Sequence, residues 1–261
     1  MYDRKISSLM LKPWPIWKYL WKLQLKTNPL VLPIIALLIS SIFTSSAYAL
    51  SNNFAEWRNY TVFDTSTIID DNIPFIKHTI IVYGIYYLLF CLMALSAPLN
   101  KEGLVECILA NQILFYQSTL CIFAFLIAPI KVDTRVGLDT GDGLIASFYE
   151  ILYLADPPYN SWPSLHVVHS IFLTGMFIRW MNSGQGLLKF PKILSNYKKL
   201  FSIMMWIICA SVIISTMTTK QHYLFDIITG MIVGFGGLHI MKSCITDVES
   251  NGSKMIAKFE S

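Results

Sequence analysis

The stretch Trp162-Pro163-Ser164-Leu165-His166-Val167-Val168-His169 ends a polar, proline-broken loop and begins an apolar run. It predicts a membrane helix that starts near Ser164, because proline suits the start of a helix, where backbone N–H groups have no partner. His166 then lies in the first turn. An ionisable side chain in a membrane segment is costly unless it is paired or faces water, so His166 is a candidate functional residue. The alternative is an interfacial histidine at a capped helix end.

The start of this helix also predicts an anion site. The backbone amides of Ser164, Leu165 and His166 would have no partner within the helix and would point outward at the positive end of its dipole. Such a helix start suits a phosphate group. Ser164 and Leu165 are therefore predicted to bind phosphate through their backbone.

A second polar boundary follows in Thr218-Thr219-Lys220-Gln221-His222-Tyr223-Leu224-Phe225-Asp226. His222 and Asp226 are four residues apart, so within a helix they share one face. A carboxylate in this position can accept a hydrogen bond from Nδ1 of the histidine, which fixes the tautomer and leaves Nε2 as a nucleophile. The alternative is a His-Asp pair that only holds two helices together, as polar side chains do in membranes.

These stretches carry a resemblance to a known family. Pro163-Ser164-Leu165-His166 and Thr219-Lys220-Gln221-His222-Tyr223 with Asp226 are similar to the last two motifs of the type 2 phosphatidic acid phosphatase superfamily. The run Asp156-Pro157-Pro158-Tyr159-Asn160 resembles the branch with leucine, not glycine, before the first histidine. Inositol phosphorylceramide and sphingomyelin synthases belong to that branch, beside many phosphatases. The resemblance covers about residues 125 to 240.

The candidate residues supply the parts that phosphoryl transfer needs: a nucleophile, cations around the phosphoryl oxygens, and an acid for the leaving group. His222 is the predicted nucleophile and would form a phosphohistidine, with Asp226 orienting its ring. His166 is the predicted acid for the leaving alcohol and then the base for water. The resemblance implies the same three roles. We predict no metal and no other cofactor, because cations and backbone amides can neutralise the phosphate.

Three cations are predicted to bind the phosphate: Lys131 and Arg135 in the loop before the first motif, and Lys220 beside His222. They depart from the family pattern. Thr216 replaces the arginine six positions before the second histidine, and Lys131 and Arg135 lack the Arg-Pro pair of the family's first motif. The alternative for all three is ordinary positive charge at a lipid headgroup surface.

The whole chain has the composition of a membrane protein. Of its 261 residues, 54% are hydrophobic and 14% are charged, and the mean hydropathy is +0.53. These values exclude an ordinary soluble domain. The five cysteines show no paired spacing and are predicted to be small core residues. The expected partners are the bilayer and a lipid phosphate. We predict no nucleic-acid partner, and the sequence indicates no particular protein partner.

Six apolar runs predict an all-α bundle of six transmembrane helices, at about residues 29–50, 79–97, 104–128, 164–181, 201–217 and 222–241. We expect one membrane domain over residues 29–241, between an amphipathic segment on the membrane surface (1–28) and a cytoplasmic tail (242–261). The first run could instead be a signal peptide that is cleaved after Ala47-Tyr48-Ala49, but its length favours an uncleaved span.

Two further features concern the third run and the loop that follows it. The third run carries polar residues between Asn111 and Thr119, which would hydrogen-bond between helices or, alternatively, line a cavity. The long loop after it contains a short amphipathic helix near Leu144 to Leu154. Long loops of this kind are usually functional.

The distribution of cations orients the predicted spans. With the N-terminus inside, the inner segments hold fifteen lysines and arginines and the outer loops hold five. Both termini are then cytoplasmic. His166, His222 and Asp226 meet at the outer membrane face, toward the periplasm, a lumen or the exterior.

Together, the residues and the resemblance predict a membrane lipid phosphatase that hydrolyses a phosphomonoester or pyrophosphate lipid through a phosphohistidine. The first alternative is a phosphotransferase that passes a phospholipid headgroup to an alcohol, as inositol phosphorylceramide and sphingomyelin synthases do. The second is a metal transporter or intramembrane metalloenzyme, because His169 could complete a metal site with His222 and Asp226. A channel or scaffold without chemistry is the last alternative.

Overall fold

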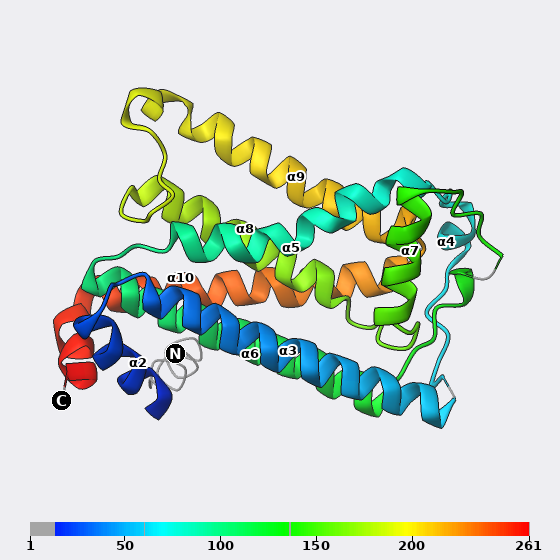
Figure 1. Cartoon of the computed structure of the whole chain (residues 1–261), viewed down its shortest axis with the longest axis horizontal. Coiled ribbons are helices and arrows are strands. Elements are labelled where there is room, and N and C mark those ends of the chain that lie inside the picture. Colours follow the sequence, from blue (N-terminus) through cyan, green and yellow to red (C-terminus); the bar gives the residue numbers. More distant parts are fainter. Residues whose placement is uncertain (1–13, 60, 136, 261) are drawn as a thin grey trace.

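The computed structural model describes residues 14–59, 61–135 and 137–260. In these ranges the chain is mostly helical, and its only β-structure is a bridge between Ile130 and Asn160. The long helices run side by side, and α7 lies across one end of them (Figure 1). The α-helices are α2 Pro15–Lys26, α3 Val31–Arg58, α4 Ile68–Asn72, α5 Ile80–Ser96, α6 Lys101–Ile127, α7 Leu144–Ala155, α8 Leu165–Ser183, α9 Lys198–Thr218 and α10 Leu224–Glu260. Short 3₁₀ helices cover Lys77–Thr79, Asp133–Arg135 and Lys192–Tyr197.

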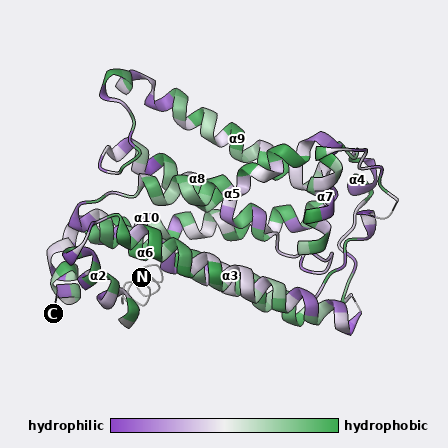
Figure 2. Cartoon of the chain, viewed as in Figure 1, coloured by the Kyte–Doolittle hydropathy of each residue, from purple (hydrophilic) through white to green (hydrophobic). Residues whose placement is uncertain are grey.

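Five of the described helices are long and apolar enough to cross a membrane: α3, α5, α6, α9 and α10. They are hydrophobic along most of their length, while hydrophilic residues gather at the two ends of the bundle (Figure 2). Large apolar side chains such as Leu38, Phe123 and Ile207 are exposed on them, as expected where lipid takes the place of water. The prediction of an all-α membrane bundle is confirmed.

The fourth predicted span corresponds to α8, which is not among these five helices. α8 packs against α5, α6, α9 and α10, so protein surrounds it. Every residue from Leu165 to Thr174 is buried. Because its neighbours are helices and not lipid, α8 can carry polar side chains such as His169 and Ser170, which lower its hydropathy.

Small residues let α8 and α10 approach closely. A β-carbon on Gly230 would lie 2.8 Å from the backbone oxygen of Ser164, and one on Gly234 would lie 3.1 Å from that of Val168. Both distances are shorter than ordinary van der Waals contact, which begins at 3.4 Å. The glycines therefore set the spacing of the two helices and bring the start of α8 beside the start of α10.

Polar side chains of α6 hydrogen-bond to neighbouring helices, as predicted. Gln117 Nε2 donates to the backbone oxygen of Val233 in α10 at 2.7 Å, and Ser118 Oγ lies 2.9 Å from Nε2 of His169 in α8. None of the residues that line the main cavity belongs to α6. The alternative, that these side chains line a cavity, is therefore not supported.

Both ends of the described chain are helical. Of the predicted surface segment, residues 1–13 lie outside the described residues, and α2 buries Trp17 and Trp21 against the bundle. The Trp21 ring stacks on Phe259 with 4.9 Å between ring centroids. The predicted tail is helical, because α10 continues to Glu260 with one non-helical residue at Asn251. The aromatic face of α2 thus packs on protein, at the end of the bundle opposite α7 (Figure 1).

Three further predictions concern the short helix before α8, the cysteines and the length of the first span. The short helix near residues 144–154 is confirmed as α7. All five cysteines are free, and four of them are buried. The first predicted span ends too early, since α3 continues to Arg58.

Candidate active site

His222 lies in the short loop between α9 and α10, two residues before α10 begins. Its Nδ1 hydrogen-bonds to the backbone oxygen of Ser161 at 3.1 Å. A carbonyl oxygen only accepts, so Nδ1 carries the proton, and Nε2 of the neutral ring has a free electron pair. Asp226 Oδ2 lies 3.6 Å from the same Nδ1. The expected Nδ1 hydrogen bond is therefore made by Ser161, because His222 precedes the helix, and the carboxylate of Asp226 lies beside the same nitrogen.

Asp226 joins three parts of the site. Its Oδ2 accepts a hydrogen bond from the amide of Tyr223 at 2.9 Å, which caps the start of α10. Its backbone oxygen accepts from the amide of Ser164 at 3.1 Å. The Ser164 amide is consequently not free for a phosphate, which corrects that part of the predicted anion site. The Ser164 side chain instead caps α8, accepting from Val167 N.

His166 lies in the first turn of α8 and faces His222. Its Nδ1 is 3.4 Å from Nε2 of His222, and its Nε2 is 2.6 Å from the hydroxyl of Tyr83 in α5. Since Nε2 of His222 can only accept, Nδ1 of His166 is the donor between them. The two histidines that the sequence singled out are thus brought together, although 56 positions separate them.

A segment between α3 and α5 holds the His222 loop in place. Asp70 of α4 is buried and accepts a hydrogen bond from the amide of Leu224 at 2.7 Å. In return, Nζ of Lys220 donates to the backbone oxygens of Ile73 at 2.6 Å and Asp70 at 3.2 Å. Lys220 therefore ties the loop to α4 and does not line the recess that contains His222. Its predicted role in phosphate binding is not supported by this position.

The two other predicted cations have different surroundings. Lys131 is exposed and pairs with Asp133 at 3.1 Å, and this hydrogen bond raises the pKa of the Lys131 ammonium. Arg135 is mostly buried, with its side chain 11% exposed, and donates to the backbone oxygen of Asp156 at 2.6 Å. Arg135 lines the recess with His222, and its Nε has no hydrogen-bond partner within the described residues. Of the three cations, only Arg135 lies at the site.

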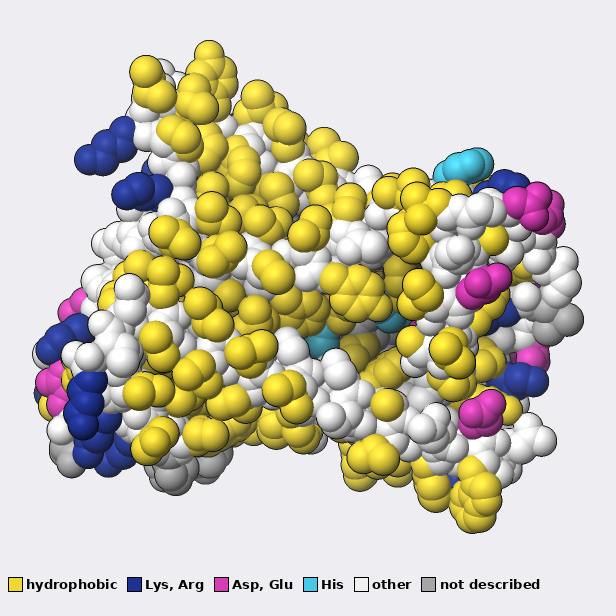
Figure 3. Space-filling model, viewed as in Figure 1, with side chains coloured by type: hydrophobic (Ala, Val, Ile, Leu, Met, Phe, Trp, Pro, Cys, Tyr) yellow, Lys and Arg dark blue, Asp and Glu magenta, His cyan; other side chains and the backbone are white. Residues whose placement is uncertain are grey.

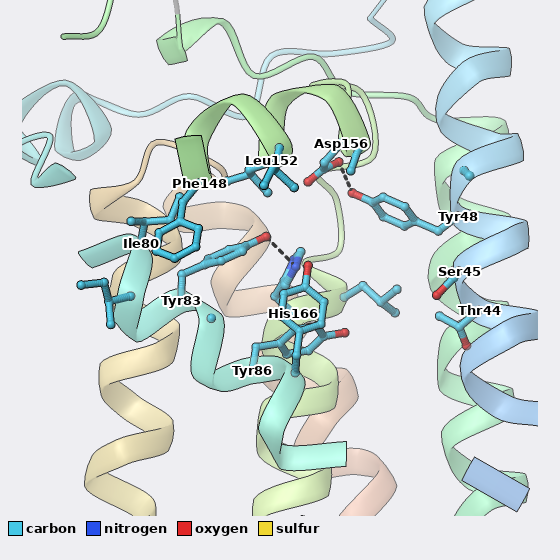
Figure 4. A pocket seen from close by; sticks show the side chains of 17 residues that line it. Thr44, Ser45, Tyr48, Ile80, Tyr83, Tyr86, Phe148, Leu152, Asp156 and His166 are labelled. Atoms are coloured by element: carbon cyan, nitrogen blue, oxygen red, sulfur yellow. Dashed lines mark hydrogen bonds between the residues drawn. The ribbon is translucent and has the colours of Figure 1, made fainter. Parts of the chain in front are cut away.

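A cavity of about 570 Å³ leads to His166. Its lining is mostly apolar and comes from α3, α5, α7 and the start of α8, including Leu165. Figure 4 shows His166 between α3 and α5, with Phe148 and Leu152 of α7 above it. The molecular surface is hollowed over this region, and histidine is visible at the bottom of the hollow (Figure 3). The cavity is suited to the hydrocarbon part of a lipid.

A hydrogen bond lies between this cavity and the polar recess around His222, which is too narrow to admit a water molecule. Tyr48 of α3 donates to Asp156 Oδ1 at 2.6 Å, and both residues line both spaces. Asn52 Nδ2 donates to the same carboxylate oxygen at 3.1 Å. Oδ2 of Asp156 lies 3.8 Å from Arg135. The apolar and polar parts of the site therefore meet at one buried carboxylate.

Sequence reasoning missed Tyr48 and Tyr83 as site residues. Both are tyrosines inside apolar runs, where an aromatic side chain at a helix surface is ordinary and carries no signal of its own. Asp156 had a signal, because it opens the polar run that resembles the family branch. Its contact with Arg135 was not predictable, since it depends on how the loop before α8 folds back.

His169 does not join the other candidates. Its Nδ1 bonds to the hydroxyl of Tyr86 and its Nε2 to that of Ser118, each at 2.9 Å. Among the described residues, no group of three or more His, Cys, Asp and Glu side chains could hold a metal ion. The geometry therefore gives no support to the alternative of a metal site.

Comparison with known families finds one match. The model of the PAP2 superfamily matches residues 138–249. The matched segment contains α7, α8, α9 and most of α10, and with them His166, His222 and Asp226. No curated protein and no solved structure matches the chain. This match supports the type 2 phosphatidic acid phosphatase (PAP2) superfamily, whose members are phosphatases and phosphotransferases, for the segment that carries both histidines.

Proposed function

We propose that the protein removes a phosphoryl group from a membrane lipid, a phosphomonoester or a pyrophosphate, through a phosphohistidine on His222. The pairing of the two histidines carries this proposal: Nε2 of His222, with its free electron pair, faces Nδ1 of His166 at 3.4 Å. A nucleophile and a proton donor that face each other can act on the same phosphate ester once the rings part to admit it.

In the first step, Nε2 of His222 attacks phosphorus and the bond between phosphorus and the ester oxygen breaks. Protonated His166 gives its proton to that oxygen, and the lipid leaves as an alcohol or, from a pyrophosphate, as a monophosphate. The phosphorylated ring of His222 is positively charged. The carbonyl of Ser161 accepts a hydrogen bond from its Nδ1–H, and the carboxylate of Asp226, 3.6 Å away, stabilises its charge.

In the second step, water attacks the phosphorus of the phosphohistidine. His166, now neutral, takes a proton from this water, and the bond between phosphorus and Nε2 breaks. Inorganic phosphate leaves, and His222 regains its electron pair. One histidine thus serves first as acid and then as base, and both protons are accounted for.

We infer that Arg135 holds the phosphoryl oxygens. It lines the same recess as His222, and its buried Nε has no partner within the described part of the chain. A guanidinium offers several donors in one plane, which matches a phosphoryl group. The amide of Leu165 at the start of α8 is a second candidate. With these groups the reaction needs no divalent metal, so we expect activity to survive EDTA.

The apolar cavity supports a lipid as the substrate, because it reaches His166 between helices that lipid surrounds. The same cavity would admit a lipid alcohol to the phosphohistidine, with His166 removing the proton of its hydroxyl group. This supports the second candidate function, transfer of a phosphorylated headgroup to diacylglycerol or ceramide. Both functions place a covalent intermediate on His222, but the transferase intermediate keeps the headgroup on phosphorus, and a lipid alcohol takes the place of water as the acceptor.

The test is to trap the intermediate. Purified protein is incubated with ³²P-labelled lipid phosphates, with and without diacylglycerol or ceramide, and quenched. We expect label on His222, none in His222→Ala, and release of phosphate where water is the acceptor. His166→Ala should lose about a hundred- to ten-thousandfold in rate on lipid esters, and much less on a p-nitrophenyl ester, whose leaving group needs no proton.

Three results would count against the proposal. Label on His166 would reverse the two roles. Loss of activity on chelation, restored by one specific metal, would favour the metal alternative. Asp226→Asn at the wild-type rate would remove Asp226 from the mechanism.

A further inference from the structure

We propose that Tyr83 of α5 is a positioning residue that keeps His166 aligned in both of its protonation states. The inference rests on the proposed function, because it assigns a part in the same acid–base cycle. Tyr83 belongs to no motif of the family and lies in the middle of an apolar run. We therefore infer its role in aligning His166 from the geometry of the site.

The contact between the two side chains is short and buried. The Tyr83 hydroxyl lies 2.6 Å from Nε2 of His166, with Tyr83 3% and His166 8% exposed. The ring centroids are 4.8 Å apart, and the ring of Tyr86, three residues later in α5, lies 4.6 Å from His166 on centroids. Figure 4 shows the hydroxyl of Tyr83 directed at the imidazole. His166 therefore lies against two tyrosine rings, and of these two tyrosines Tyr83 is the one that hydrogen-bonds to it.

In the neutral state the hydrogen bonds run in one direction. Ser161 O fixes the proton of His222 on Nδ1, so Nε2 of His222 accepts from Nδ1 of His166. Nε2 of His166 is then unprotonated, and the Tyr83 hydroxyl must be the donor to it. Tyr83 thus keeps the Nδ1 proton of His166 on the side that faces His222, where the substrate has to sit.

In the protonated state His166 carries a second proton on Nε2. That N–H is buried and needs an acceptor, and within the described residues Tyr83 Oη is the one atom in hydrogen-bond reach of it. A phenol can both donate and accept, so rotation of its O–H bond serves the cation without movement of the imidazole. Without this hydroxyl the charged acid would leave a donor unsatisfied in an apolar cavity.

The kinetic test compares Tyr83→Phe with Tyr86→Phe. Both variants lose one buried hydroxyl from the same helix, but the hydroxyl of Tyr86 bonds to His169, not to His166. We expect Tyr83→Phe to lower kcat about 10- to 100-fold on alkyl phosphates, which need the acid, and much less on a p-nitrophenyl ester. Tyr86→Phe should keep the wild-type ratio between the two substrate classes, whatever its overall rate. Loss of packing would affect both classes equally.

A spectroscopic test on the same variants is independent of turnover. In protein labelled with ¹⁵N-histidine, Tyr83→Phe should move the Nε2 resonance of His166, whereas Tyr86→Phe should move the Nδ1 resonance of His169. An unchanged His166 resonance in Tyr83→Phe would overturn the contact. Equal rate losses on alkyl and aryl esters in Tyr83→Phe would overturn the role of Tyr83 and leave the proposed reaction intact. Wild-type protein that releases no phosphate from any ester would overturn the proposed reaction and the role of Tyr83 with it.

Discussion

Replacement of Gly230 by alanine tests whether the site depends on the close approach of α8 and α10. The new β-carbon would lie 2.8 Å from the backbone oxygen of Ser164 and 3.0 Å from Cβ of Val167. Ordinary contact begins at 3.4 Å, so the helices must part by about 0.6 Å. The same movement would stretch the 3.1 Å bond from the Ser164 amide to Asp226 O and the 3.4 Å contact between His166 and His222.

The expected effect falls on activity more than on stability. Because a displacement of about 1 Å can cost roughly 100-fold in rate, we expect a loss of about tenfold in kcat. Overpacking lowers the free energy of unfolding by about 1–3 kcal/mol. Replacing a helical glycine by alanine raises it by about 0.5–1 kcal/mol, so the protein should still fold. Gly236→Ala is the matched control, since a β-carbon there meets nothing within 4 Å.

The assay measures phosphate release from a lipid phosphate together with thermal unfolding in the same detergent. Gly236→Ala should keep its rate and unfold at the wild-type temperature or slightly above it. Wild-type turnover in Gly230→Ala would refute the argument that helix spacing sets the geometry of the histidines. So would an equal loss of rate in both variants.

Further predictions concern the cation, the cavity and the orientation in the membrane. Arg135→Lys keeps the charge but loses the planar set of donors, so kcat/KM should fall about 10- to 100-fold, while Lys131→Gln at the exposed Asp133 pair should change it little. Gly84→Leu would extend into open space in the apolar cavity. It should raise KM for long-chain lipid phosphates and leave a short soluble ester unaffected; equal effects on both would contradict the cavity assignment. A membrane-impermeant thiol reagent should label a single cysteine at residue 142 on intact cells and not one at residue 192; the reverse pattern would put the site in the cytoplasm.

The helices and the two histidines could be predicted from the sequence for a physical reason. A membrane excludes unpaired polar groups, so His166, His222 and Asp226 in or beside apolar runs stand out against their surroundings. The same contrast located the membrane helices and the amphipathic α7. Each of these predictions needed only local sequence and the cost of burying polar groups.

The partners of these residues could not be predicted in the same way. Ser161 contributes only a backbone oxygen, which every residue has. Lys220 and Arg135 are cations in neighbouring loops, and only the folded loops decide that one ties down α4 while the other enters the recess. The tryptophans of α2 have the pattern of a surface helix, yet α3 and α10 offer them a protein surface in place of lipid.

The hydrogen bond from Tyr48 to Asp156 lies between the apolar cavity and the closely packed polar residues around His222, the proposed nucleophile. In the proposed reaction the lipid alcohol is released on the apolar side of this hydrogen bond and the phosphate on the polar side. The lipid alcohol can diffuse away within the plane of the membrane, whereas the phosphate ion can depart only toward water. Products that leave in different directions do not recombine readily, so we expect each to act as a product inhibitor independently of the other.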